Sequence, residues 1–324
     1  MQRSILTMAS GKAVYVNMAV NLARSFIIHH INTDIKFYIA TDLPNLIPKD
    51  VIDNHQIQII EFKEGAYGTG FSTKLHLDKI APSEYTLFID ADCLLTGSLL
   101  PVFEKLKGKP VSVIGRPLQD GEWFGDVAHF CKQFNVKSIP GFNGCLYYIE
   151  NSDIARKVYQ KARELEPHYE EMGMVLLRGK PNDELLISVS MAIHGLHETL
   201  DDGYIYGDPL ASPGKIKIDV MKGICVMENP QYPNPLHYRH NPFHITHPKI
   251  CHFLGSHTEY PPYTTQAYIL KKYFQKKHSV FIIRIMAFFK YDLPYSINKS
   301  FKNIFRPIYH TIMGTRKIKT SKRV

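Results

Sequence analysis

The chain has 324 residues, of which 44% are hydrophobic and 21% charged. This composition is typical of a globular protein and excludes disordered and fibrous classes, and no apolar stretch approaches the roughly 20 residues that cross a bilayer. The first residues lack the long apolar core of a signal peptide. The five cysteines are scattered without a C-x-x-C pair, which argues against a disulfide framework or a zinc module. We therefore expect a cytoplasmic protein.

The net charge of +9 is unevenly distributed along the chain. Residues 269–324 hold 14 of the 39 Lys and Arg but a single acid, Asp292, which gives this segment +13 and the other 268 residues −4. A strongly basic segment meets a negatively charged partner, such as a membrane surface or a nucleic acid, or only solvent. Because the composition changes after residue 266, we predict two regions, residues 1–266 and a basic, aromatic-rich helical region at 267–324.

Apolar, strand-like segments alternate with segments of helical spacing over the first two-thirds of the chain. The expected strands are residues 4–8, 35–40, 56–60, 85–89 and 111–114, and the expected helices are 15–29, 99–106 and 185–192. Such alternation predicts a parallel sheet covered by helices on both faces. Prolines cluster between residues 230 and 262, which indicates irregular chain that lines a site.

Two carboxylates, Asp90 and Asp92, follow the apolar strand at residues 85–89. In open α/β sheets, ligands gather outside the carboxyl ends of the strands. Two acids at such a place repel each other, and a hard divalent cation is the usual way to relieve the repulsion. A D-x-D triplet also arises by chance, so an acidic loop or a helix cap is the alternative interpretation.

Longer blocks around these acids resemble glycosyltransferase family 8, which includes glycogenin and lipopolysaccharide galactosyltransferases. The T-K-L-H stretch in residues 70–77 precedes the strand that ends in D-A-D. The other matching blocks are residues 4–15, the F-N-x-G-like block at 142–149, the D-Q-like block at 183–186 and the H-F-x-G block at 252–255. The resemblance implies a GT-A type fold, a Rossmann-like mixed α/β sheet flanked by helices. It also implies hexose transfer from a nucleotide diphosphate sugar, expected to be UDP-linked, with retention at the anomeric carbon.

The resemblance assigns a metal ion to Asp90, Asp92 and His252. Two carboxylates and one imidazole suit Mn²⁺ better than Mg²⁺, which prefers oxygen ligands alone. The alternative for His252 is a buried histidine that donates to a backbone carbonyl. Other nearby histidines could take the same role, namely His244, His247 and His257.

Three residues are candidates for catalysis on the same resemblance. Lys74 would reach the phosphates or stabilise developing charge, or else it is an ordinary solvated lysine. Asp183 would contact the sugar or the reacting face, or else it complements the dipole at the start of a helix. Glu184 stands where the D-Q block has glutamine.

The resemblance also gives a set of residues for binding the nucleotide and the sugar. They are Thr7, Ala9, Tyr15, Lys74, Asp90, Ala91, Asn143, Gly144, Gly255 and His257. Tyr15 would stack on the base or belong to the core, and Asn143 would pair with sugar hydroxyls or form a turn. The lysine that usually follows H-F-x-G is missing here, so either His257 or a basic residue elsewhere substitutes for it, or the donor site differs.

The alternatives to a retaining transferase are an inverting GT-A transferase with an acidic general base and a non-catalytic binder of sugar nucleotides or nucleic acid. Residues 280–289 are too short to span a bilayer but can lie in its interface, with lysines and aromatics around them. We therefore expect a peripheral anchor on anionic lipid and a glycan or lipid-linked acceptor, the alternative being a helical cap on the catalytic region. No nucleic acid is expected.

Overall fold

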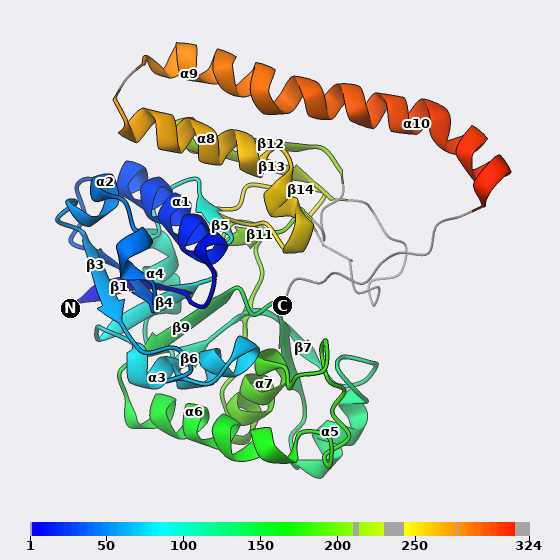
Figure 1. The fold of residues 1–324 in the computed structure, drawn as a ribbon. Coiled ribbons are helices and arrows are strands. Elements are labelled where there is room, and N and C mark those ends of the chain that lie inside the picture. Colours follow the sequence, from blue (N-terminus) through cyan, green and yellow to red (C-terminus); the bar gives the residue numbers. More distant parts are fainter. Residues whose placement is uncertain (1, 210–213, 230–242, 277, 315–324) are drawn as a thin grey trace.

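Figure 1 shows the fold in the computed structural model, which describes residues 2–209, 214–229, 243–276 and 278–314. Residues 230–242 of the proline-rich stretch, Lys277 and the bases at 316–323 lie outside the described residues. A six-stranded sheet forms the centre. In spatial order its strands are β3 (Ile57–Glu61), β2 (Lys36–Thr41), β1 (Arg3–Ala9), β4 (Tyr85–Ile89), β9 (Leu146–Glu150) and β6 (Val111–Ser112).

The sheet is mixed, as the resemblance implies. Strands β3, β2, β1 and β4 pair in parallel, whereas β9 runs antiparallel to both β4 and β6. The alternation of strands and helices therefore predicts the first four strands correctly and fails at β9. Asp90 follows the last residue of β4, and the register Ile89↔Leu146 brings the start of β9 beside it.

Helices cover both faces of the sheet (Figure 1). Neighbouring residues of a strand point to opposite faces. Ile5 and Leu87 accordingly pack with α1 and α4, while Leu6 and Phe88 pack with α6 and α7. The helices are α1 (Ala13–His29), α2 (Lys49–Ile52), α3 (Leu77–Ile80), α4 (Leu100–Leu106), α5 (Val127–Gln133), α6 (Asp153–Leu165), α7 (Asp183–Ile193), α8 (Tyr263–Phe274), α9 (Val280–Ala287) and α10 (Leu293–Met313).

Three smaller sheets complete the described part of the chain. Their orders are β10-β7-β8, β11-β15-β5 and β12-β13-β14. The strands are β5 (Cys93–Leu95), β7 (Ile114–Leu118), β8 (Ile139–Phe142), β10 (Thr199–Leu200), β11 (Tyr206–Gly207), β12 (Ile216–Asp219), β13 (Ile224–Glu228), β14 (Ile245–Thr246) and β15 (Ile250–His252). Antiparallel pairing of β5 with β15 places Cys93 opposite His252.

Helix α8 continues across residue 266, where the sequence predicts a division. The Gln266 side chain accepts from Val220 N (3.0 Å) and donates to Ile218 O (3.1 Å), which ties this helix to β12. Helix α9 then packs Ile283 and Ala287 against α8. A π-helical turn, Phe288–Asp292, joins α9 to α10 in one long helix along the edge of the molecule (Figure 1).

Candidate active site

The turn after β4 presents the two carboxylates. Asp90 N donates to Cys145 O (2.9 Å), and Cys93 N donates to Asp90 O (3.1 Å), so the turn is fixed between β9 and β5. The side chains of Asp90 and Asp92 are each 24% exposed. Both acids therefore lie at the carboxyl edge of the sheet and are partly open to solvent, as the sequence predicts for a strand-end pair.

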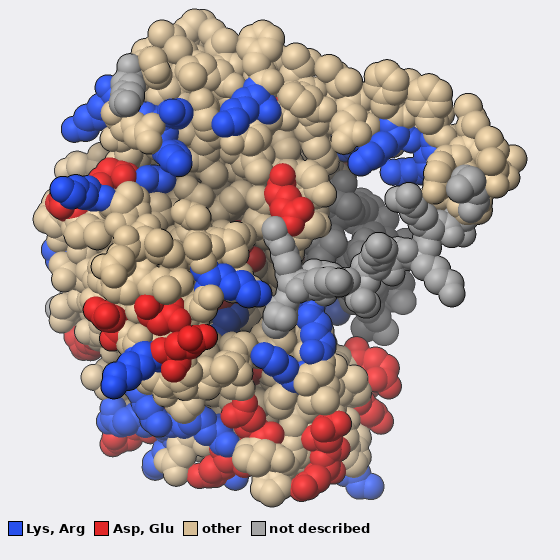
Figure 2. Space-filling view, viewed as in Figure 1, with Lys and Arg blue, Asp and Glu red and all other residues tan. Residues whose placement is uncertain are grey.

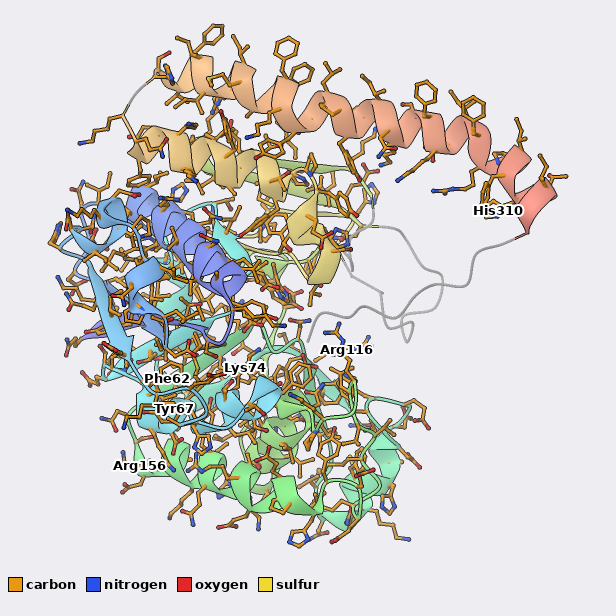
Figure 3. The ribbon with its side chains drawn as sticks, in the orientation of Figure 1. Phe62, Tyr67, Lys74, Arg116, Arg156 and His310 are labelled. Carbon is orange, nitrogen blue, oxygen red and sulfur yellow. The ribbon has the colours of Figure 1, made fainter. Side chains whose placement is uncertain are left out.

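Lys74 is bound to this edge rather than solvated. It lies on the 3₁₀ helix Gly70–His76, and Figure 3 places it near the middle of the molecule. Its Nζ is 2.8 and 2.9 Å from the two oxygens of Asp90 and donates to Gly144 O at 2.7 Å. Burial lowers the pKa of Lys74, but the carboxylates of Asp90 and Asp183 outweigh burial and raise it above the usual value. Lys74 is therefore a fixed positive charge.

The start of α7 brings two further carboxylates to the same place. Asn182 caps the helix by accepting from Glu184 N (2.6 Å), so Asp183 occupies the first turn, as the helix-start interpretation also predicts. Tyr147 donates to Asp183 Oδ2 at 2.5 Å, and Gly144 N donates to Glu184 Oε1 at 2.7 Å. Lys74 and the adjacent pair Asp183 and Glu184, which are distant from it in sequence, thus meet around Gly144.

Burial shifts the protonation of these acids. It raises the pKa of Asp183, and the nearby Lys74 only partly opposes the effect. Burial and the charge of Asp183 raise the pKa of Glu184 to about 8. A carboxyl group with such a pKa can both give and take a proton near neutral pH.

His252 lies beside Asp92, on the strand that pairs with β5. Its Nε2 is 3.2 Å from Asp92 Oδ1. Burial lowers the pKa of His252, but the Asp92 carboxylate and Cys145 outweigh burial and raise it well above its usual value. Among the described residues, Asp92, Cys93 and His252 form a cluster whose possible ligand atoms lie within 4.8 Å of one another. Asp90 instead faces Lys74.

The donor set fits a divalent metal ion. Within the described part of the chain, Asp92 Oδ1 and His252 Nδ1 are buried and accept or donate no well-aligned hydrogen bond. Unsatisfied buried polar atoms are rare in folded proteins because each costs free energy, so they indicate a missing partner. A carboxylate oxygen and an imidazole nitrogen are ordinary ligands of Mn²⁺ and Zn²⁺.

The nucleotide candidates near β1 divide into two groups. Thr7 and Ala9 lie at the carboxyl end of β1, and Thr7 Oγ1 is buried without a hydrogen-bond partner among the described residues. Tyr15 lies on α1 and packs partly against the hydrophobic core, with Lys12 Nζ 5.8 Å from its ring centre. Base stacking by Tyr15 stays a prediction, and core packing accounts for part of its surface.

The remaining binding candidates surround the same edge. Asn143 Oδ1 accepts from Cys145 N (3.1 Å), which is the turn role that the sequence left open. Ala91 lies between the two aspartates. Gly255 and His257 lie on a 3₁₀ helix, Gly255–Glu259, that follows β15 closely. Their contacts with a nucleotide stay predictions.

Two residues of the candidate site, Tyr147 and Cys93, were not predicted from the sequence. Tyr147 is fully buried in β9 and holds Asp183, and the only sequence signal is its place in a strand of alternating faces. Cys93 directly follows Asp92 and lies opposite His252, a position that becomes visible only when β5 and β15 are paired.

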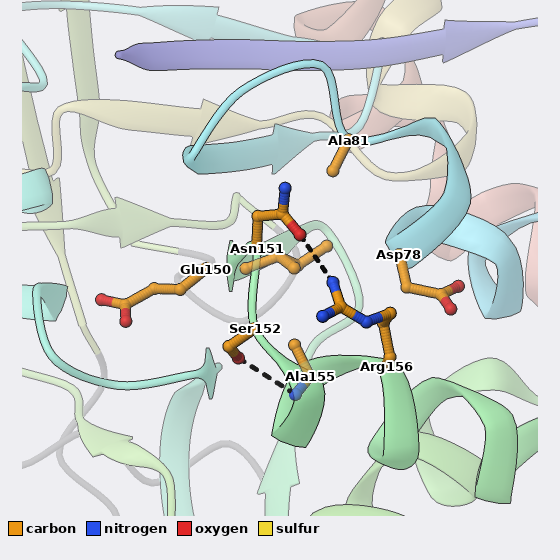
Figure 4. Close-up of a pocket in the computed structure, with 8 residues that line it drawn as sticks. Asp78, Ala81, Glu150, Asn151, Ser152, Ala155 and Arg156 are labelled. Atoms are coloured by element: carbon orange, nitrogen blue, oxygen red, sulfur yellow. Dashed lines mark hydrogen bonds between the residues drawn. The ribbon is translucent and has the colours of Figure 1, made fainter. Parts of the chain in front are cut away.

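A separate small pocket lies at the start of α6, away from this edge (Figure 4). Its lining includes Asp78, Asn151, Ser152 and Arg156. Arg156 donates to Asn151 Oδ1 (2.7 Å), and Ser152 caps α6 by accepting from Ala155 N (3.2 Å). Asp78 accepts from Arg163, so the polar groups of this pocket are engaged in contacts that hold the start of α6 and its neighbours in place.

Comparison with known proteins supplies the fold family. No family model and no curated protein matches the sequence. The galactosyltransferase LgtC, in complex with donor and acceptor sugar analogs, is similar with a TM-score of 0.56 at 14% identity, over 85% of this chain and 96% of that chain. An active-site mutant of LgtC gives 0.52 at 15% identity, over 78% and 87%. The glycosyltransferase GlyE of Streptococcus pneumoniae TIGR4 gives 0.50 at 14% identity, over 90% of this chain and 64% of its own. The chain therefore has the GT-A type α/β fold of these glycosyltransferase structures.

Proposed function

We propose that this protein is a glycosyltransferase that moves a hexose from a nucleotide diphosphate sugar, UDP-linked, to an acceptor hydroxyl. The observation that carries the proposal is the convergence of Lys74, Asp90 and Asp183 at the carboxyl end of β4. The similar structures support the same function, since one of them holds donor and acceptor sugar analogs.

The donor diphosphate would bind at the carboxyl edge of the sheet, where a metal ion and Lys74 would supply positive charge. Asp92 and His252, with Asp90 on the resemblance, would hold Mn²⁺ or Mg²⁺. Such an ion neutralises negative charge on the diphosphate as it leaves. Lys74 adds a second, permanent positive charge from the protein itself. Charge stabilisation of this kind is usually the largest contribution that a site makes.

Asp183 would act on the sugar. Because Tyr147 binds its Oδ2, this carboxylate is held in one orientation. A held carboxylate can accept from sugar hydroxyls and stabilise positive charge at the anomeric carbon. We propose retention of configuration, and proton NMR of the first-formed product tests it: an α-linked product from an α-linked donor is expected, and a β-linked product contradicts retention.

The raised pKa of Glu184 favours a second candidate function, an inverting transferase. A pKa of about 8 would let Glu184 take the proton from an acceptor hydroxyl as a general base near neutral pH. The same NMR measurement separates the two, since only the inverting route gives a β-linked first product from an α-linked donor.

Metal-dependent donor hydrolysis tests the function as a whole. Nucleotide sugars are screened with Mn²⁺ by thermal shift, because a tightly bound donor raises the melting temperature, and the best donor is then assayed for release of the free nucleotide diphosphate. Asp90→Asn and Asp92→Asn are each expected to abolish release while the fold is kept. Asp120→Asn, at an exposed position, is the matched control. Equal turnover by all variants contradicts the roles of Asp90 and Asp92, whereas no release by the wild type with any donor contradicts the proposed function and favours a non-catalytic binder.

We also propose an anionic membrane surface as partner, and with it a glycan or lipid-linked acceptor at that surface. No helix in the described ranges is long and apolar enough to cross a bilayer. Helices α9 and α10 nevertheless expose large apolar side chains, with Phe281 72%, Ile304 66% and Ile312 74% exposed. Figure 2 shows this outer edge mostly uncharged, with blue side chains below α10.

The alternative, a helical cap on the catalytic region, accounts for only one side of α9. Ile283 and Ala287 do pack on α8, and Arg284 binds Asp219 (2.8 Å), so α9 is partly a cap. The opposite side of the same helix has no cover among the described residues. An amphipathic helix with basic and aromatic residues is typical of binding at a lipid interface.

A further inference from the structure

Cys93 lies next to Asp92 and His252, the two residues that fit a metal ion. It is fully buried at the start of β5, directly after Asp92. Because β5 and β15 are antiparallel and Cys93 pairs with His252, their side chains lie on the same side of the two strands. The Cys93 sulfur therefore lies within 4.8 Å of possible ligand atoms on Asp92 and His252.

The ligand set differs from the one that the sequence predicts. Asp90 directs both oxygens to Lys74, at 2.8 and 2.9 Å, and is not part of the cluster. What remains is one carboxylate, one thiol and one imidazole. His252 is 1% exposed, and its Nε2 lies 3.2 Å from Asp92 Oδ1, so the imidazole is held beside the carboxylate of the same cluster.

The three donor types together select the metal. Thiolate sulfur favours Zn²⁺ and other borderline ions, whereas Mn²⁺ and Mg²⁺ prefer oxygen. A second thiol, Cys145, lies beside Cys93 and His252 and makes the surroundings richer in sulfur. For a given set of ligands, affinity is also generally lower for Mn²⁺ than for Co²⁺ or Zn²⁺.

We propose that Cys93 is a metal ligand, and that Asp92, Cys93 and His252 bind Zn²⁺ or Co²⁺ more tightly than Mn²⁺. On binding, the S–H bond of Cys93 breaks, the electron pair stays on sulfur and forms the sulfur–metal bond, and the proton passes to solvent. The proposal deepens the metal site of the proposed function, but it does not depend on any transfer reaction.

A Co²⁺ titration of the metal-free, full-length protein tests the sulfur–metal bond directly. Co²⁺ bound to a thiolate absorbs in the near ultraviolet by charge transfer from sulfur, whereas Co²⁺ bound to oxygen and nitrogen alone does not. The wild type is expected to show this band, and Cys93→Ser to lose it. Cys131→Ser, at a buried cysteine on α5, is the matched control and is expected to keep the band. Zn²⁺ is expected to displace Co²⁺ at a concentration at least about tenfold below that of Mn²⁺.

Each other outcome has a distinct meaning. No band in the wild type overturns the proposal, and the proposed transferase survives if Mn²⁺ still supports donor binding. A band that persists in Cys93→Ser and disappears in Cys145→Ser overturns the choice of Cys93. If Cys93→Ser fails to fold, X-ray absorption of the Zn²⁺-loaded wild type decides, because a sulfur neighbour of the metal supports the proposal and a shell of oxygen and nitrogen alone overturns it.

Discussion

Gly144 lies where three side chains of the candidate site meet. A Cβ at this position would lie 3.0 Å from Glu184 Cγ and Tyr147 Oη and 3.1 Å from Asp183 Oδ2. None of these groups can move far, since they are bound to one another or to the backbone. Gly144→Ala is therefore expected to cost about 1–3 kcal/mol of unfolding free energy and to displace Asp183.

Urea denaturation and the donor-release assay measure both effects of Gly144→Ala. Gly97→Ala is the control, because the three atoms nearest to its Cβ all belong to the flexible side chain of Lys249, the nearest of them at 2.7 Å. We expect the control to lose less stability and to keep its activity. Equal losses of stability and activity in the two variants would show that the close contacts around Gly144 do not matter more than those around Gly97.

Glu184 makes stability depend on pH. Its pKa is about 8 in the folded protein and 4.5 ordinarily, so the folded state holds a proton that the unfolded chain has lost. The contribution of Glu184 to stability is therefore complete below pH 4.5 and decreases as the pH rises towards 8. Glu184→Gln cannot ionise, and its amide oxygen can still accept from Gly144 N. We expect this variant to gain about 1–2 kcal/mol over the wild type at the upper end of that range and little at the lower end.

Thermal unfolding of the metal-free protein across this pH range checks the Glu184 prediction. Glu170→Gln, at an exposed position, serves as the control and should follow the wild type. A constant difference between Glu184→Gln and the wild type at every pH would mean that Glu184 is ionised throughout.

At the scale of elements, His30 joins the end of α1 to the start of α4. It is fully buried, accepts from Leu99 N at 3.0 Å through Nε2, and lies 3.0 Å from Phe26 O through Nδ1. This pair of contacts needs a neutral ring that donates from Nδ1. Burial lowers the pKa of His30 to about 4, from an ordinary 6.5. The folded protein therefore resists protonation that the unfolded chain accepts.

The consequence of the His30 contacts is a loss of stability in acid. The contribution is complete above pH 6.5 and decreases as the pH falls towards 4, by about 2–3 kcal/mol in all. His30→Gln is expected to be less stable at neutral pH but to lose less on acidification, as urea denaturation at several pH values would measure. His55→Gln, at an exposed position, should keep the wild-type slope. An unchanged slope in His30→Gln would contradict the assignment.

The elements also show what the sequence could and could not predict. The apolar run at Tyr85–Ile89 predicts β4 with both of its bounds, because a continuous apolar run of 5 residues suits a buried strand and is short for a helix. The direction of β9 was not predictable from alternation, since parallel and antiparallel central strands are equally apolar. The contact of Lys74 with Asp90 and the pairing of Cys93 with His252 depend on tertiary packing, which a spacing in the chain does not encode.

At the scale of the whole molecule, the exposed apolar face of α9 and α10 predicts binding to anionic vesicles. The face is formed by Phe281, Ile285, Phe288, Phe289, Ile297, Phe301, Ile304, Phe305, Ile308 and Ile312. Exposed bases on the same helix, Lys299, Lys302 and Arg306, would each add about 1 kcal/mol near an anionic surface. Phe281→Ser, Phe301→Ser and Phe305→Ser combined should release the protein, and high salt should weaken binding.

Sedimentation with vesicles of anionic or neutral lipid measures this binding. Ile31→Ser combined with Leu200→Ser is the control, because both residues are at least 63% exposed but lie outside α8–α10. Binding that ignores lipid charge would remove the role of the bases. If the wild type instead forms dimers that the triple variant loses, and ignores vesicles, the face binds a second copy of the chain.

The π-helical turn at Phe288–Asp292 decides whether that face exists at all. Ile285 and Ile297 are 12 residues apart in sequence, which in an unbroken α-helix would turn them about 120° from each other. The turn absorbs one residue beyond the α-helical repeat, which leaves them about 20° apart. Deleting a single residue here would make the π-helical turn unnecessary, because the two isoleucines would then be 11 residues apart and again about 20° from each other in an unbroken α-helix. The π-helical turn thus accommodates one extra residue without rotating the two halves of the apolar face away from each other.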